Sequence, residues 1–324
     1  MSADFIGGCE RINDANGAAD EFHLCSVTRL IYARCPRSAR FLVVSRSAPH
    51  ARVSTGDQYL DGSDLGMRVL AVAAVKGGVG KTTTAVNLAY LAAKSGQRTL
   101  IIDLDPQGAA SYLLRVRGSE NESPADGQAH PTDIPLLDVL PAPAGWMVAG
   151  DGLDASLPDP FWLRTTVDAI GDWYDEIFLD CPPGLSELSD GVISLADALL
   201  VPLIPSPLSV RTLESLQDRI KELDCGSPLV LPFFSMVDRR RKLHRELIES
   251  VQIARPETLS APVPYSADVE RMGVVLAPVA RFAPSCPAVA CYEAIWSEIQ
   301  VRFRSRNVSE PKTQATIFAR EAGA

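Results

Sequence analysis

The chain lacks the main sequence features of membrane-spanning and secreted proteins. Its 324 residues contain no apolar run of about 18 residues free of charge and proline, so no membrane-spanning helix is expected. The first residues carry Asp4 and Glu10, where a signal peptide would be basic. Seven cysteines occur without a spacing pattern, which argues against a zinc site or a disulfide framework and favours a reducing compartment. We therefore expect a soluble, cytoplasmic protein.

Positive charge is also scarce. The formal net charge is -9, from 31 Lys and Arg residues against 40 Asp and Glu residues, which does not suggest a nucleic-acid-binding protein. One short stretch, 239–245, departs from this balance, and we call it the basic segment. Two interpretations of the basic segment stay open: a solvated charged loop, or a site that binds DNA phosphates without sequence preference. Its basic residues are Arg239, Arg240, Arg241, Lys242 and Arg245.

Composition and length fit one α/β domain with appendages. The chain is 46% hydrophobic and 22% charged, and strand and helix patterns alternate through residues 67–306. Residues 1–66 do not follow this alternation, and an Arg- and Ser-rich stretch without acids lies within them. We expect this extension to be disordered or to precede the native start, with a partner-binding arm as the alternative. Residues 307–324 form a polar C-terminal tail.

A glycine-rich segment with two lysines is the most informative motif. It reads Lys76-Gly77-Gly78-Val79-Gly80-Lys81-Thr82-Thr83 and lies between an apolar run, 69–75, and a helix-forming stretch, 84–94. Small residues let successive backbone N–H groups surround a polyphosphate at a helix N-terminus. Lys81 supplies a charge for the β- and γ-phosphate oxygens, and Thr82 offers a hydroxyl to Mg²⁺. The order strand, loop, helix predicts a nucleotide-binding phosphate loop.

The phosphate loop departs from the pattern G-x-x-x-x-G-K-[ST] at one position, because Val75 stands where the first glycine is expected. With Lys76 in the next position, it resembles the deviant Walker A motif of the ParA/MinD superfamily of ATPases. Partition-type members of that family often lack the first glycine. The resemblance extends over residues 67–306 and implies a P-loop NTPase with a mostly parallel, doubly wound α/β sheet flanked by helices.

Two acidic motifs follow in the order that the resemblance requires. An apolar strand ends in Asp103-Leu104-Asp105-Pro106-Gln107-Gly108, which resembles switch I of the family. Asp103 and Asp105 share a strand face, since side chains alternate with period two. The resemblance implies that Asp103 contacts Mg²⁺ indirectly, through the groups bound to the ion. It implies that Asp105 orients the hydrolytic water.

The second acidic motif, Ile177-Phe178-Leu179-Asp180-Cys181-Pro182-Pro183-Gly184, resembles the Walker B and switch II segment. By this match Asp180 would hold Mg²⁺ through water. The fixed φ of the two prolines would place the following backbone amides near the γ-phosphate. Cys181 has no C-x-x-C partner and no nearby histidine, so we interpret it as a packing residue.

The later part of the chain also matches the family. A strand over 198–205 runs into a loop and a capped helix, and a strand over 229–238 precedes the basic segment. Residues 261–270 resemble the segment that closes over adenine in relatives. The resemblance implies further nucleotide contacts from Asn87, Pro205 and Pro264. Apolar residues at helical spacing predict a final helix packed on the sheet, with Tyr292, Ile295, Ile299 and Phe303 facing it.

The resemblance implies an ATP-dependent dimerising switch. ATP and Mg²⁺ would join two protomers face to face, with Lys76 of each protomer reaching the phosphates of the other, and hydrolysis would release the pair. Such an ATPase would act in chromosome or plasmid partitioning or in positioning a cellular cargo on the nucleoid. Its expected partners are a second copy of the chain, a ParB-like or cargo adaptor protein, and non-specific DNA, with no membrane.

Three alternatives stay open, and the last two belong to other classes of protein. A MinD-like positioning ATPase would be expected to end in a basic amphipathic helix, which the tail over 307–324 lacks. A metabolic P-loop enzyme of the dethiobiotin synthetase or cobyrinate amidase kind would need a small-molecule pocket. A binding module with ATP as a structural ligand would have no chemical need for the whole set Lys76, Lys81, Asp105 and Asp180.

Overall fold

The computed structural model describes the backbone of part of the chain. The described ranges are 5–6, 9–12, 22–25, 66–115, 129–141, 160–223 and 228–309, with side chains described from residue 66 onward except at 160–161 and 307–309. The comparison with MinD-like ATPases depended on the polar tail over 307–324, of which residues 310–324 lie outside these ranges. Within the N-terminal extension the described backbone forms a small antiparallel sheet. Its strands are β1 (Phe5–Ile6), β2 (Cys9–Ile12) and β3 (Phe22–Cys25).

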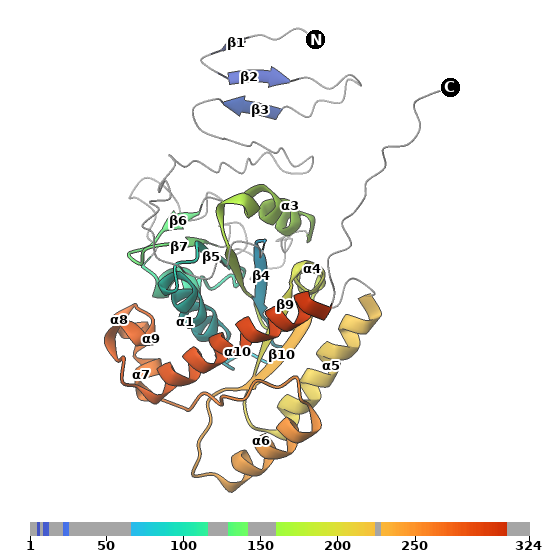
Figure 1. Cartoon of the computed structure of the whole chain (residues 1–324), viewed down its shortest axis with the longest axis vertical. Helices are drawn as coiled ribbons and strands as arrows, with labels where there is room; N and C mark the ends of the chain where they lie inside the picture. Colours follow the sequence, from blue (N-terminus) through green and yellow to red (C-terminus); the bar gives the residue numbers. More distant parts are fainter. Residues whose placement is uncertain are drawn as a thin grey trace, which may run out of the picture.

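A second sheet of seven strands organises residues 66–309 (Figure 1). Its strand order is β10-β9-β4-β8-β5-β7-β6, and every neighbouring pair is parallel except β6 with β7. This confirms the predicted mostly parallel, doubly wound sheet. The strands are β4 (Arg68–Val72), β5 (Thr99–Asp103), β6 (His130–Pro131), β7 (Leu137–Leu140), β8 (Glu176–Asp180), β9 (Ala198–Leu203) and β10 (Leu229–Phe234).

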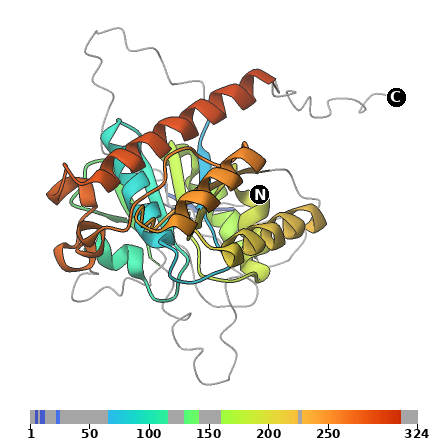
Figure 2. The ribbon, with the colours of Figure 1, turned by 90° about the horizontal axis from the view of Figure 1, so that it is seen from below.

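Helices cover both faces of this sheet, and β4 shows how the sequence divides between them. Leu70 and Val72 pack with one group of helices, while Val69 and Ala71 pack with the other, because side chains alternate along a strand. The first group is α1 (Lys81–Lys94), α2 (Ala109–Leu113), α7 (Ala267–Glu270), α8 (Met272–Val275), α9 (Val279–Phe282) and α10 (Pro287–Ser309). The second group is α3 (Pro160–Ile170), α4 (Glu187–Leu195), α5 (Pro207–Leu223) and α6 (Lys242–Ala254). Figure 2 shows α10 (red) and α5 (yellow) on opposite sides of the sheet.

Strand β10 is shorter than the sequence predicts. We expected it to continue to Asp238, but it ends at Phe234. Met236 has a φ of 54°, a left-handed conformation that a strand cannot contain. Pro232 is tolerated within β10 because this strand lies at the edge of the sheet, where a missing N–H leaves no neighbour unpaired.

The last helix, α10, packs against Arg68, the first residue of β4. Arg68, at the start of β4, forms a buried ion pair with Glu176, at the start of β8. Its guanidinium also donates to Gln300 of α10 over 2.9 Å and lies 4.8 Å from the ring centre of Phe303. Burial lowers the pKa of Arg68 to about 10. The predicted apolar face of α10 is confirmed, since Tyr292, Ile295, Ile299 and Phe303 are all buried.

Candidate nucleotide-binding site

The glycine-rich segment forms the connection between β4 and α1. Gly78 and Gly80 have φ values of 69° and 91°, so both need the left-handed backbone conformation that glycine adopts without strain. Gly80 caps the N-terminus of α1, and Lys81 is the first residue of the helix. Lys81 is only 7% exposed, whereas Lys76 is exposed at the start of the loop. The loop thus presents backbone N–H groups at the positive end of a helix, as anion binding requires.

Two buried carboxyl groups lie beside this loop. Asp103 ends β5 and Asp180 ends β8, and the two are direct register partners in neighbouring strands. Both are fully buried. Ser111 donates its backbone N–H and its hydroxyl to Oδ2 of Asp103, over 2.9 and 2.8 Å. Within the described residues, Oδ1 of Asp103 and both carboxylate oxygens of Asp180 have no hydrogen-bond partner.

The pKa values of both carboxyl groups are shifted upward. Burial raises the pKa of Asp180 well above its usual range, and the charge of Asp103 adds to the rise. Lys81 and the Thr82 hydroxyl oppose this shift, although the hydroxyl faces Asp180 without forming a hydrogen bond of good geometry. Burial also raises the pKa of Asp103, against the two bonds from Ser111. A cation bound between these groups would favour the ionised carboxylates and so oppose both shifts.

The diproline loop after β8 lies against the phosphate loop. A Cβ built on Gly77 would lie 3.8 Å from Cβ of Pro183, so the two loops lie close together at this point. Cys181 is buried, and burial raises the pKa of its thiol, which fits the packing role predicted for it.

A small apolar hollow lies next to the diproline loop. It is lined by residues that include Val75, Leu185 and Ile193. Its lining has no charged group, so this hollow is not the nucleotide site.

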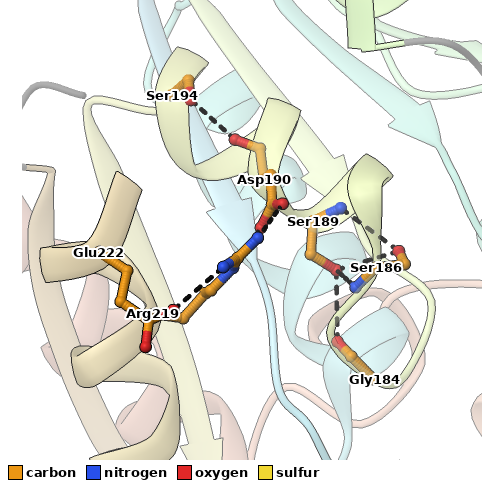
Figure 3. A network of polar contacts seen from close by, with 7 residues as sticks. All are labelled: Gly184, Ser186, Ser189, Asp190, Ser194, Arg219 and Glu222. Atoms are coloured by element: carbon orange, nitrogen blue, oxygen red, sulfur yellow. Dashed lines mark hydrogen bonds and ion pairs between the residues drawn. The ribbon is translucent and has the colours of Figure 1, made fainter. Parts of the chain in front are cut away.

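The end of the diproline loop is tied to α4, and α4 is tied to α5 (Figure 3). Ser186 caps α4, and its own N–H donates to Oγ of Ser189 over 3.1 Å. Ser189 Oγ also donates to the carbonyl of Gly184 over 3.3 Å. Asp190, which lies one helical turn after Ser186, accepts two bonds from Arg219 of α5, over 2.9 and 2.5 Å. We call these residues the α4 clasp.

The remaining predicted site residues fall into two groups. Asp105, Pro205 and Pro264 all lie beyond the carboxyl ends of strands, the edge that carries the phosphate loop. Asp105 is half-buried and accepts the N–H of Gln107 over 3.0 Å. Asn87 differs: it is 2% exposed, and its amide binds the carbonyl of Thr83 and the N–H of Val279, over 2.7 and 3.0 Å. Its amide therefore joins the first turn of α1 to α9.

The basic segment follows β10 and is partly neutralised by nearby acids. Arg240 pairs with Asp238 over 3.0 Å, and Lys242 pairs with Glu246 over 3.3 Å. The guanidinium of Arg245 donates to the carbonyls of residues 239 and 240, over 2.7 and 3.3 Å. Within the described part of the chain, Arg239 and Arg241 form no ion pair. The segment keeps a positive charge, but less than its composition indicates.

Comparison with known proteins identifies the family. A family model described as an AAA domain matches residues 67–226. The chain is 31% identical over 257 residues to the chromosome partitioning protein ParA of Caulobacter vibrioides, an alignment that covers 74% of this chain and 96% of that protein. The chain belongs to the ParA family of ATPases. The chromosome-partitioning ATPase Soj of Thermus thermophilus is 30% identical over 248 residues, covering 73% of this ParA-type chain and 96% of Soj.

Solved structures agree on the ParA-type fold. The chain resembles a putative plasmid partition protein of Borrelia burgdorferi bound to AMPPNP, with a TM-score of 0.61 and 20% identity, over 73% of this chain and 99% of that one.

Across the described residues, no helix has both the length and the apolar character needed to cross a bilayer. The same residues contain no group of three or more His, Cys, Asp or Glu side chains that could hold a metal ion.

Proposed function

We propose that the carboxyl edge of the sheet binds ATP with Mg²⁺ and hydrolyses it, and that the bound nucleotide controls dimerisation of two copies of the chain. One observation carries this proposal. The phosphate loop, with two left-handed glycines at the N-terminus of α1, lies beside a buried carboxyl pair that includes Asp180, whose oxygens have no hydrogen-bond partner among the described residues. An anion cradle next to unpaired buried carboxylates suits a nucleotide polyphosphate with a divalent cation.

The residues present fit Mg²⁺. Magnesium usually keeps several waters and takes one or two protein groups in addition to phosphate oxygens, so a cluster of three protein ligands is not required. Thr82 and Asp180 would hold the ion. Asp103 would accept a hydrogen bond from a water molecule that is bound to the ion. Bound Mg²⁺ neutralises charge on the β- and γ-phosphate oxygens. The unpartnered oxygens of Asp180 and Asp103 supply the acceptors that the ion and its waters need.

The chain's own groups would position the reactants. Lys81, buried at the first turn of α1, would contact the β- and γ-phosphates, together with the N–H groups of the loop from Gly77 to Thr83. Lys76 is exposed and so is available to reach the phosphates of the partner subunit. Asp105 would orient the attacking water. Pro205 and Pro264 lie at the same edge and would border the base.

The cellular role that we propose is partition. The named relatives are chromosome-partitioning proteins, and a ParA-type switch in the cytoplasm would distribute a chromosome, a plasmid or another cargo with the help of a ParB-like adaptor protein. Non-specific DNA contact through the basic segment would place it on the nucleoid. A metabolic P-loop enzyme remains the rival, because it would share this fold and loop.

Turnover without any small-molecule acceptor separates these functions. The purified full-length chain is expected to release phosphate from ATP in Mg²⁺ alone, and to lose this activity in EDTA and in the Lys81→Ala variant. Phosphate release should rise when DNA or an adaptor protein is added. A chain that binds ATP but releases phosphate only with a metabolite acceptor would contradict the proposal and favour the metabolic enzyme.

A further inference from the structure

The phosphate loop is held from behind by a residue of another strand. Ser235, the first residue after β10, donates its hydroxyl to the carbonyl of Val79 over 2.7 Å. Ser235 is 4% exposed and Val79 is 2% exposed, so water does not replace this contact readily. The two residues are 156 positions apart in the sequence. Neither the phosphate-loop motif nor the switch motifs include this serine.

The bond fixes the direction of one loop amide. The carbonyl of Val79 and the N–H of Gly80 belong to the same peptide unit, which is planar and trans, so they point in opposite directions. Rotation of this peptide changes ψ of Val79 and φ of Gly80. Gly80 has a φ of 91°, and glycine crosses between left- and right-handed conformations at little cost. Without a partner for the carbonyl, this peptide could rotate. With the carbonyl held by Ser235, the N–H of Gly80 points away from Ser235.

Ser235 is itself held in place by the sheet. Its backbone N–H donates to the carbonyl of Leu203 in β9 over 2.8 Å. The next residue, Met236, has a φ of 54°, and its terminal methyl group lies 4.0 Å from where a Cβ on Gly80 would be. Val237 then donates to the carbonyl of Val263 over 3.0 Å. The serine hydroxyl is therefore presented to the loop by a segment with bonds on both sides.

We infer that Ser235 is a positioning residue of the phosphate loop: it orients the peptide between Val79 and Gly80 for binding the nucleotide phosphates. This inference rests on the proposed function, since it concerns the same site. Ser235 touches no phosphate and acts through the loop backbone. Its removal should weaken nucleotide binding and leave the fold intact, because only one hydroxyl group is lost.

The test measures affinity for Mg²⁺–AMPPNP by calorimetry in the full chain, with the melting temperature recorded without nucleotide. Ser235→Ala should weaken binding about five- to tenfold, because a buried carbonyl loses its donor. Ser235→Thr keeps the hydroxyl and should bind within about twofold of the wild type. Thr99→Val is the matched control. Thr99 is fully buried and donates its hydroxyl to the carbonyl of Gln97 over 2.9 Å, at the opposite edge of the same sheet.

The possible outcomes are distinct. Equal affinity in Ser235→Ala and the wild type, or an equal loss in Thr99→Val, would overturn the inference while leaving the proposed function in place. Absence of AMPPNP binding by the wild type would overturn the proposed function itself. If Ser235→Ala does not fold, Ser235→Cys provides a weaker donor of similar size. Its affinity for Mg²⁺–AMPPNP should lie between that of the wild type and that expected when the carbonyl of Val79 has no donor. Wild-type affinity in this variant would refute the inference.

Discussion

At the scale of single residues, the two lysines of the phosphate loop differ in burial, and we expect them to differ in function. Lys81 is buried at the start of α1, whereas Lys76 is exposed. Lys81→Ala should abolish ATP binding, because the β- and γ-phosphate charge loses its direct partner. Lys76→Ala should keep ATP binding but lose the ATP-dependent dimer and its hydrolysis. Nucleotide titration combined with size-exclusion chromatography measures both steps, and a Lys76→Ala protein that still dimerises with ATP would refute a role across the interface.

Asp105 gives the second prediction at this scale. It is half-buried and follows β5, and its carboxylate accepts only the N–H of Gln107 among the described residues. If it orients water and does not hold the metal ion, Asp105→Ala should bind ATP and remain dimeric. Its turnover should fall by on the order of 10² to 10⁴, the usual cost of losing one positioning group in the reaction. Single-turnover phosphate release measures this, and wild-type turnover would assign the role to another residue.

At the scale of elements, the α4 clasp links the diproline loop to α5. Arg219 and Asp190 are partly exposed, with 37% and 22% of their side chains accessible, so their pair adds little to stability. Its effect on the diproline loop is expected in the turnover rate. Arg219→Ala should lower kcat about two- to fivefold, because loss of a weak ion pair shifts the population of the competent loop by a small factor. The Michaelis constant for ATP should stay constant.

Glu214 supplies the matched control for the α4 clasp. It pairs with Arg255 over 3.2 Å from the same helix, α5, but neither residue contacts α4 through a hydrogen bond or ion pair within the described ranges. Glu214→Ala should therefore leave kcat unchanged. A double exchange, Arg219→Asp with Asp190→Arg, should restore part of the lost activity. An equal fall of kcat in the Glu214 variant would mean that the clasp has no special role.

The elements differ in how far the sequence predicted them. The phosphate loop, β5 and β8 were predicted because their residues are contiguous, and parallel strands bring their carboxyl ends to one edge, which places Asp103 beside Asp180. The contacts of Ser235 with Val79 and of Arg219 with Asp190 were not, since pairs far apart in the chain leave no periodic pattern. The same limit applies to Asn87, whose position in α1 does not tell whether its amide faces a ligand or α9.

At the scale of the whole molecule, we predict that the N-terminal extension, residues 1–66, can be removed as a unit. Among the described residues, β1, β2 and β3 pair only with one another, and β4 of the seven-stranded sheet starts at Arg68. A chain that begins at Met67 should keep its ATPase rate and its melting temperature. Calorimetric melting and phosphate release check both. A fall of several degrees, equivalent to more than about 1 kcal/mol for a domain of this size, would show that the extension is part of the fold.

The DNA binding that we propose is also a property of the whole molecule, since a dimer would present two basic segments. Binding should appear only with ATP and should weaken steeply with salt, each phosphate contact contributing about -0.9 to the slope of log K against log salt. Changing Arg239, Arg240 and Arg241 to Glu should abolish binding. Basal ATP turnover should persist, because the bonds described for these arginines stay within residues 238–245, whereas Ser235 contacts the loop. Filter binding in ATP, in ADP and without nucleotide measures the effect.

Exposed basic residues elsewhere provide the control for DNA binding. Arg164 on α3 and Lys221 on α5 are 61% and 76% exposed, and both lie outside the basic segment. Changing these two to Glu should leave DNA affinity close to that of the wild type. Equal binding in all three nucleotide states, or none at low salt, would mean that the basic segment is a solvated loop.

The ion pair between Arg68 and Glu176 has a consequence for synthesis on the ribosome. Strand β4 is the first strand of the large sheet to be made, yet its neighbour β8 starts 108 residues later. At about 5 to 20 residues per second, translation leaves β4 without that neighbour for roughly 5 to 20 seconds. During this time its apolar residues have no strand to pair with on that side, and α10, which covers Arg68, has not yet been made. We therefore expect the apolar residues of β4 to stay exposed on the nascent chain, where chaperones can bind them, for longer than those of a strand that pairs with the next strand in a hairpin.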